Sequence, residues 1–304
     1  MRPVTRVLSF LGGCAALFGV ALGVGDLVGP VASEPTGMAG HGADEEMAGM
    51  VHHDVGGLEA SADGYTLGLA GDRRDAGLQS LAFTVTGPDG RPVTAYDEQH
   101  RRDLHLVVVR RDLTGFQHVH PTLDRATGEW RTDVELTPGA WRVLADFRPT
   151  GAEQLVLGTD LLVSGDFDPD PLGEDSLEAH VDGYHVTLRG NLAAGEETVL
   201  TATVLRDGQP VTDLQRYLGS YGHLISLRGG DLGYLHVHPD EDSTPGPAVS
   251  FHTEFPTPGR YRLFLDFRHG GAVHTAAFTV TVGGAADGTV DGGSHDSGEE
   301  SHDH

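Results

Sequence analysis

The chain has 304 residues, enough for two domains of ordinary size, and Gly 44 and Pro 16 favour turns over long helices. Asp+Glu 45 against Lys+Arg 20 gives a net charge of -25 at pH 7, which excludes nucleic acid as a partner because an acidic surface repels phosphate. The single cysteine, Cys14, excludes an intramolecular disulfide and a multi-cysteine zinc site, so any metal must be bound by carboxylate, methionine or the 18 histidines.

The N-terminus carries an apolar segment. Residues 7–25 contain no charge and follow Arg2 and Arg6, and a helix of this length nearly crosses the apolar core of a bilayer. No further basic residue occurs before Arg73, which predicts a cytoplasmic start and an external body. We therefore expect residues 1–29 to be an uncleaved membrane anchor, with a removed signal segment and a secreted protein as the alternative.

A tether without helical or strand periodicity is predicted for residues 30–56. Every methionine apart from the initiator lies in it, among histidines. Thioether and imidazole groups together suit copper, particularly the cuprous ion, although low complexity without a metal role is the alternative. The candidate ligands in the tether are Met38, His41, Met47, Met50, His52 and His53.

A duplication follows the tether. The matching segments keep nearly the same separation along the chain, so one module has been copied with a short slip in a loop. The matched pairs are 89–93 with 207–211, 104–106 with 222–224, 118–121 with 236–239, 137–139 with 257–259, and 146–148 with 266–268.

Each copy consists of short segments of period-two hydrophobicity separated by Gly, Pro and Asp turns. This pattern predicts an all-β fold of two tandem immunoglobulin-like antiparallel β-sandwiches. Strands are expected at 81–86, 104–110, 116–120, 130–136, 141–147 and 155–163, and the second copy repeats the plan over 184–282. The predicted organisation is anchor 1–29, disordered tether 30–56, first sandwich 57–165, linker 166–176, second sandwich 177–283 and disordered acidic, histidine-containing tail 284–304.

The histidines of each copy are spaced as metal ligands would be. Residues two apart in a strand share a face, and a hairpin turn would bring a third histidine beside such a pair. The interval between the first two histidines of each set is the same in both copies while the turn residues differ, which favours one cluster in each half. The predicted ligands are His105, His118 and His120, then His223, His236 and His238, with Asp146 and Asp266 as fourth ligands or as partners that orient an imidazole. His100 and His252 have no counterpart and are weaker candidates.

The segments DLHLVVVRRDLTGFQHVHP (103–121) and YLGSYGHLISLRGGDLGYLHVHP (217–239) resemble those of exported actinobacterial proteins with YtkA-like domains. The resemblance covers residues 57–283, and the general plan is distantly similar to that of CopC-like copper-handling sandwiches. It implies an extracytoplasmic, non-catalytic, copper-related protein whose metal ligands are the six histidines of the two copies. CopC-like sites usually begin at a processed N-terminal histidine, which this chain lacks, so coordination details are not carried over.

The expected function is binding of a transition metal, copper or alternatively zinc, for sequestration or delivery. The expected partner is a membrane copper transporter or another exported metal carrier. No enzyme is expected, because no phosphate-binding loop or nucleophile motif occurs and no general acid or base stands beside the histidines. Two alternatives are a cell-surface interaction module with structural histidines, and a metalloenzyme, since three histidine ligands leave an open coordination position.

Overall fold

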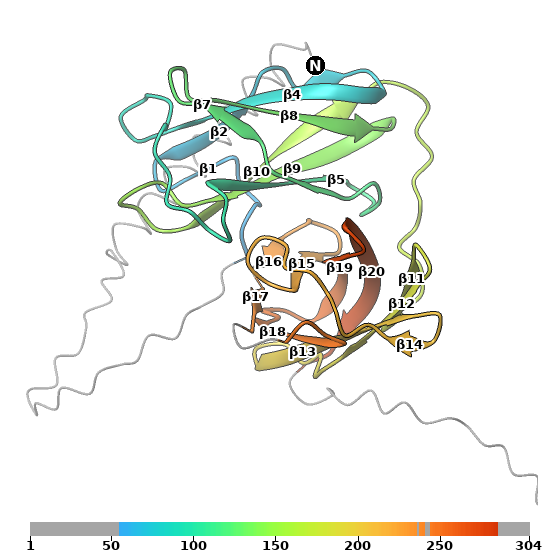
Figure 1. The fold of residues 1–304 in the computed structure, drawn as a ribbon. Helices are drawn as coiled ribbons and strands as arrows, with labels where there is room; N and C mark the ends of the chain where they lie inside the picture. The colour runs from blue at the N-terminus through green and yellow to red at the C-terminus, as the bar shows by residue number, and fades with distance from the viewer. Residues whose placement is uncertain (1–54, 236, 241–243, 285–304) are drawn as a thin grey trace, which may run out of the picture. The chain divides into compact units, whose positions relative to one another are not determined.

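The first copy of the repeat folds into two five-stranded sheets (Figure 1). One sheet has the order β1-β2-β4-β8-β7 and the other β3-β10-β9-β5-β6, and every pair is antiparallel except β3 with β10. The strands are β1 Ser61–Ala62, β2 Tyr65–Leu69, β3 Arg73–Arg74, β4 Gly77–Thr86, β5 Leu104–Arg110, β6 Gln117–Val119, β7 Thr122–Asp124, β8 Glu129–Leu136, β9 Gly139–Phe147 and β10 Leu155–Val163.

The second copy repeats this plan in antiparallel sheets of six and four strands. The larger has the order β11-β12-β13-β18-β17, with β14 also paired to β13, and the smaller has the order β16-β15-β19-β20. The strands are β11 Glu178–Val181, β12 Tyr184–Arg189, β13 Glu197–Arg206, β14 Gln209–Pro210, β15 Gly222–Arg228, β16 Tyr234–Leu235, β17 His238–Pro239, β18 Ala248–Glu254, β19 Gly259–His269 and β20 Ala272–Val282.

These elements come from a computed structural model that describes residues 55–235, 237–240 and 244–284. All of the described residues lie in strands, turns or loops, and a helix able to cross a membrane is not found among them. The predicted anchor, nearly all of the tether and the tail beyond residue 284 lie outside this part of the chain. The predicted all-β fold of two tandem immunoglobulin-like antiparallel sandwiches is confirmed.

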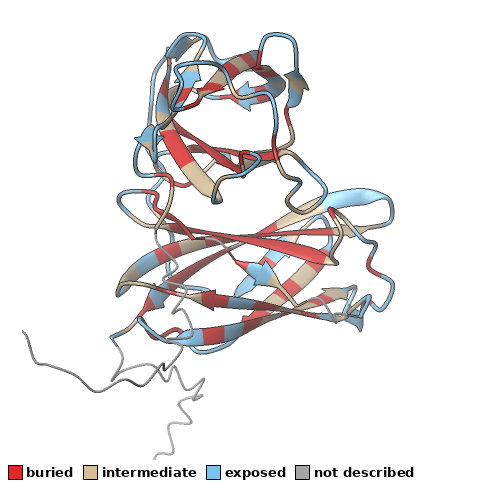
Figure 2. Ribbon diagram, turned by 90° about the vertical axis from the view of Figure 1, so that its left-hand side faces the viewer, coloured by how far each residue is buried: buried red, intermediate tan, exposed pale blue. Residues whose placement is uncertain are grey.

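Apolar residues at every second position of the strands give the sheets of each sandwich one buried face. Buried and exposed residues alternate along the strands (Figure 2), as in β13, where every second residue from Thr198 to Val204 is buried. In the first sandwich Trp130 is 2% exposed, lies parallel to Phe83 and donates its indole N–H to Tyr96 Oη at 3.2 Å. Each sandwich therefore has its own apolar core.

Strands β5 and β15 depart from this alternation, since six successive residues of each are buried. On β5, Leu104, Leu106 and Val108 pack into the core of the first sandwich, while Val107 and Val109 join a third apolar cluster. This inter-sandwich cluster combines residues of both copies, which belong to one compact unit. Its buried members are Val107, Val109, Leu113, Leu144, Ile225, Leu227, Leu232, Tyr234 and Phe264.

Two further contacts join the copies. The rings of Phe116 and Phe264 stack with their centroids 3.9 Å apart and an interplanar angle of 6°. Gly56, just before the first sandwich, forms an antiparallel bridge with Tyr234 of the second, with N–O distances of 3.0 and 2.9 Å. Pairing between the two copies therefore includes Gly56, one residue before the predicted start of the first sandwich.

Candidate metal centre

Three histidines of the first sandwich meet at the β5–β6 hairpin. The pairing of Leu106 with Val119 and of Val107 with His118 places His105 across from His120, which follows directly after β6. In the turn between these strands, Leu113 and Gly115 have φ values of 64° and 63°. Leu113 accepts this left-handed conformation while burying its side chain in the inter-sandwich cluster.

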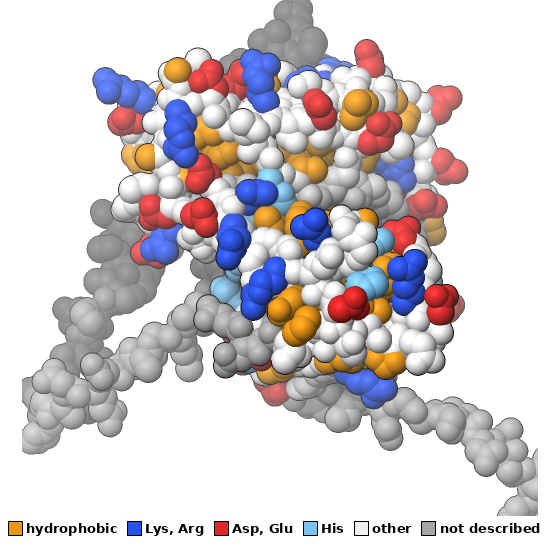
Figure 3. All heavy atoms as spheres, in the orientation of Figure 1, with side chains coloured by type: hydrophobic (Ala, Val, Ile, Leu, Met, Phe, Trp, Pro, Cys, Tyr) orange, Lys and Arg blue, Asp and Glu red, His pale blue; other side chains and the backbone are white. Residues whose placement is uncertain are grey.

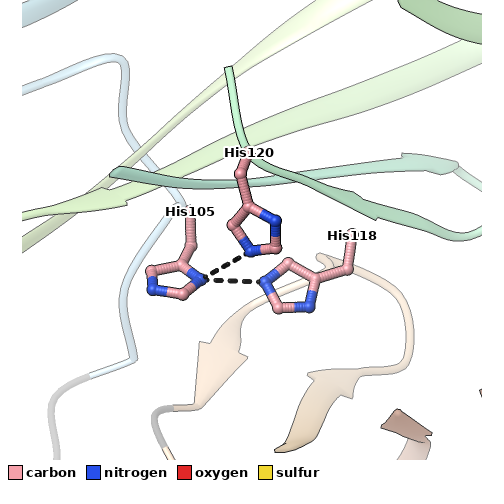
Figure 4. A group of neighbouring side chains, drawn as sticks. All are labelled: His105, His118 and His120. Atoms are coloured by element: carbon pink, nitrogen blue, oxygen red, sulfur yellow. Dashed lines mark hydrogen bonds between the residues drawn. The ribbon is translucent and has the colours of Figure 1, made fainter. Parts of the chain in front are cut away.

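The ring nitrogens of these histidines converge (Figure 4). Nδ1 of His105 lies 3.0 Å from Nε2 of His118 and 3.2 Å from Nε2 of His120. One ligand atom from each of the three side chains lies within 4.8 Å of the others, and His105 is 5% exposed. Two nitrogens that bind one metal at about 2.0–2.1 Å in tetrahedral geometry lie about 3.3 Å apart. The observed distances therefore fit a shared ion with small adjustments.

Hydrogen bonds on the outer side fix the ring tautomers of two of these histidines. His105 Nε2–H donates to the carbonyl oxygen of Gln99 at 2.9 Å, which leaves the lone pair on Nδ1. His118 Nδ1–H donates to Oδ2 of Asp266 at 2.9 Å, so in the neutral ring the lone pair is on Nε2. Carbonyl and carboxylate partners of this kind orient imidazoles for metal binding in known metal sites.

The hydrogen bonds to Gln99 and Asp266 turn one ring nitrogen of His105 and one of His118 toward each other. When both rings are neutral, the lone pairs of His105 Nδ1 and His118 Nε2 face each other at 3.0 Å and repel. A cation between the rings, either a proton or a metal ion, removes that repulsion. His120 lacks such a fixed tautomer among the described contacts, so its Nε2 can donate to His105 or bind an ion.

Burial keeps most of this cluster neutral. It lowers the pKa of His105 to about 4 and that of His120 to about 2, and the neighbouring imidazole of His118 lowers both further. Burial likewise lowers the pKa of His223 to about 3. Neutral imidazole is the form that binds metals, so these side chains are competent ligands well below pH 7.

His223 of the second copy lies beside the first cluster. Its Nε2–H donates to the carbonyl oxygen of Tyr217 at 2.9 Å, which repeats the bond from His105 to Gln99 at equivalent positions of the repeat. Its ring centroid lies 6.5 Å from that of His118 and 5.3 Å from that of His100. Histidines of both copies thus gather where the sandwiches meet.

The predicted second cluster stays a prediction, since one of its three histidines is not among the described residues. His238 is exposed and lies in β17, where it pairs with His252 in the larger sheet of its sandwich. In the part of the chain that the structure describes, neither His223 nor His238 belongs to a group of three metal-ligating side chains. His236 lies outside the described residues, as do the tether candidates Met38, His41, Met47, Met50, His52 and His53.

The two aspartates proposed as ligands or orienting partners have different roles. Asp146 pairs across the sheet with His105, but its carboxylate accepts hydrogen bonds from Gln154 Nε2 at 2.7 Å and from Tyr234 Oη at 3.2 Å. Asp266 belongs to the second copy and orients His118 of the first. Sequence reasoning placed each aspartate with its own copy. The apolar residues on both faces of β5 and β15 were the signal that these strands face a partner.

Low pH is expected to destabilise the fold because the buried histidines His105 and His223 resist protonation. In the unfolded chain they take up protons near pH 6.5, whereas in the folded chain the pKa is about 4 for His105 and about 3 for His223. Their stabilising contribution is therefore complete above pH 6.5 and is lost as the pH falls toward 4. Urea unfolding of the metal-free protein between pH 7 and pH 4 measures it.

A matched variant isolates the histidine contribution from that of the many carboxylates. His223→Asn removes one titrating group and should flatten the pH dependence of the unfolding free energy between pH 6.5 and 4. His252→Asn, at an exposed position of β18, should leave that slope unchanged. Equal slopes in wild type and His223→Asn would contradict the prediction.

No curated protein matches the chain, whereas several solved structures are similar to it. The adhesin InvE of Yersinia pseudotuberculosis is 12% identical with a TM-score of 0.21, over 71% of this chain and 58% of that one. InvD of the same organism is 13% identical with a TM-score of 0.25, over 74% and 58%. An Escherichia coli alpha-2-macroglobulin is 16% identical with a TM-score of 0.24, over 73% and 20%. The chain thus spans little more than half of each of the two Yersinia structures.

A family model gives the clearer result. The model described as a domain of unknown function, DUF8832, matches residues 60–159 and again residues 179–284, which is more than half of the chain. The two matched ranges coincide with the two sandwiches and with the duplication in the sequence. The chain therefore belongs to the DUF8832 family and carries its domain twice.

Proposed function

We propose that this protein binds a transition metal, copper or alternatively zinc, for sequestration or delivery, and that His105, His118 and His120 hold the ion. The observation that carries the proposal is the 3.0 Å approach of two ring nitrogens in imidazoles that Gln99 and Asp266 orient from the outer side. In neutral rings these hydrogen bonds aim two lone pairs at one point, which is costly unless a proton or a metal ion lies there, and they resemble the outer partners of metal-bound histidines.

Three imidazoles suit copper and zinc alike. Binding of Cu²⁺ exceeds that of Zn²⁺ at most nitrogen sites, and imidazole ligands accept both metals. A three-histidine set leaves a coordination position open, which would let a partner protein take or supply the ion by ligand exchange. The net charge of -25 would raise the local concentration of cations, an effect that salt screens.

The cellular setting of the proposal rests on the sequence. The apolar run at 7–25 behind Arg2 and Arg6 supports a membrane anchor with an extracytoplasmic body, or a secreted protein if the segment is removed. A membrane copper transporter or another exported metal carrier would be the partner. The similarity to YtkA-like and CopC-like proteins stays a prediction, as does the absence of enzymatic activity.

A specific observation favours one competing function. His118 bonds Asp266 of the other sandwich, and both side chains are nearly inaccessible, at 5% and 3% exposed. A protonated His118 would form a buried ion pair that holds the two sandwiches together. In that case the histidines would be structural, and the chain would be a non-catalytic cell-surface interaction module.

Copper titration of the full chain separates the two functions. With a chromogenic Cu(I) chelator as competitor, the variant His118→Asn/His120→Asn should bind one equivalent fewer than wild type. The control His274→Asn changes a histidine that contacts Asp182 outside the cluster, and it should bind as much as wild type. Any copper held by the tether or tail is common to all three proteins and cancels in the comparison. Unchanged copper binding together with a lower melting temperature in the double variant would favour the structural function.

A further inference from the structure

A second group of metal-ligating side chains lies on the β11–β12 hairpin, away from the buried cluster. His180 and His185 are direct cross-strand partners in this hairpin. Glu178 precedes His180 by two residues, so the two side chains share a face of the strand. Direct partners on one face are the closest neighbours that a sheet provides.

The three side chains of this group lie close together at the protein surface. The rings of His180 and His185 stack with centroids 4.5 Å apart and an interplanar angle of 10°. His185 Nε2 lies 3.2 Å from Oε2 of Glu178, and one ligand atom from each of the three side chains lies within 4.8 Å of the others. Both histidines line a surface pocket of about 400 Å³. Histidine side chains are visible on the surface of the second sandwich among acidic and arginine side chains (Figure 3).

The first sandwich provides a reference for what this hairpin needs structurally. The hairpin β1–β2 turns through Asp63 and Gly64 just as β11–β12 turns through Asp182 and Gly183, with φ values of 50°, 82°, 48° and 82° in that order. At the cross-strand position of the two histidines it has Ser61 and Thr66, whose hydroxyls lie 2.8 Å apart. A serine–threonine pair is thus sufficient for this fold, so the histidines of the second copy are not required for the hairpin itself.

We propose that Glu178, His180 and His185 form a second metal site, specific to the second copy, which takes a divalent ion such as Cu²⁺ or Zn²⁺. Two imidazoles and one carboxylate are a harder ligand set than three imidazoles, and they suit divalent ions with water in the remaining positions. Glu178 and His180 are exposed, so this site exchanges its ion directly with solvent. It is independent of the buried cluster and does not require the function proposed for that cluster.

The test uses the full chain and Cu²⁺ as the probe. The variant His180→Ser/His185→Thr installs the residues of the first copy and should keep the fold, as far-ultraviolet circular dichroism can verify. It should bind one Cu²⁺ equivalent fewer than wild type and lose the paramagnetic broadening of amide signals in residues 178–187. Glu178→Gln should keep the broadening but require at least several-fold more Cu²⁺ to reach it.

Two further variants make the result specific. His274→Asn changes a histidine that contacts Asp182 in the same hairpin but lies outside the proposed set, and it should leave Cu²⁺ binding unchanged. His118→Asn/His120→Asn should keep the hairpin broadening in full, so failure of one site is distinguishable from failure of the other. Equal Cu²⁺ stoichiometry and equal broadening in wild type and the serine–threonine variant would overturn the proposal.

Discussion

Replacement of Asp266 by asparagine is expected to weaken metal binding at His105, His118 and His120 by about 10–100-fold, although Asp266 belongs to the other sandwich. The carboxylate accepts the Nδ1–H of His118 at 2.9 Å and the hydroxyl of Thr275 at 2.6 Å. Asparagine keeps the shape but removes the negative charge that makes His118 Nε2 a stronger donor to a metal. Competition titration with a chromogenic Cu(I) chelator measures the change in affinity.

The surface pair of Asp182 and His274 supplies the matched control. Its Oδ2–Nδ1 distance is 2.7 Å, but Asp182 is 62% exposed and stands apart from the buried cluster. Asp182→Asn makes the same chemical change at the same kind of pair and should leave affinity within twofold of wild type. An unchanged affinity in Asp266→Asn would mean that the second sandwich does not support the site, and the role assigned to Asp266 would be wrong.

Much of the fold could be predicted because it depends on local pattern. The expected strands at 104–110 and 155–163 coincide with β5 and β10, because period-two hydrophobicity and Gly, Pro and Asp turns mark their limits. The expected strand at 81–86 begins four residues later than β4. Strands β1, β2, β3 and β7 were not expected, and β1, β3 and β7 have only two or three residues. Segments this short have too few residues to carry a periodic signal.

The candidate site was predictable only in part. The spacing of His105, His118 and His120 indicated the hairpin that brings them together, because hairpin register is a local property. The pairing of His118 with Asp266 is not local, since 148 residues separate the two in sequence. It depends on how two sandwiches pack, which no spacing within one copy encodes. For the same reason, the position of His223 beside the first cluster could not be read from the repeat.

His238 also differs from its counterpart His120, because the two residues have different pairing in their sheets. Continued pairing of β15 with the segment after β16 would place His238 opposite His223, as His120 lies opposite His105. Within the described residues, pairing with β15 is seen only as far as Leu235, and His238 pairs instead with His252 in the other sheet. The sheet pairing of His238 therefore differs from the position of its counterpart His120 in the first copy.

Phe264→Ala is expected to reduce the free energy of unfolding by about 3–5 kcal/mol, since it removes a large buried side chain and leaves a cavity. Phe264 is 3% exposed and stacks on Phe116 of the first sandwich at 3.9 Å. It also lies two residues before Asp266 on β19, so both side chains are on the face of the strand that meets the other copy. The variant should therefore also weaken metal binding, through a less fixed Asp266.

The control for this coupling is Phe278→Ala in β20. Phe278 is fully buried in the core of the second sandwich, so its truncation should cost a similar free energy of unfolding, measured by urea denaturation. Its metal affinity at 25 °C should equal that of wild type, because the contact between the sandwiches is intact. Loss of metal affinity in Phe264→Ala but not in Phe278→Ala would mean that metal binding depends on the contact between the two sandwiches. Equal affinity in both variants would contradict that dependence, since the three histidines would then bind independently of the second sandwich.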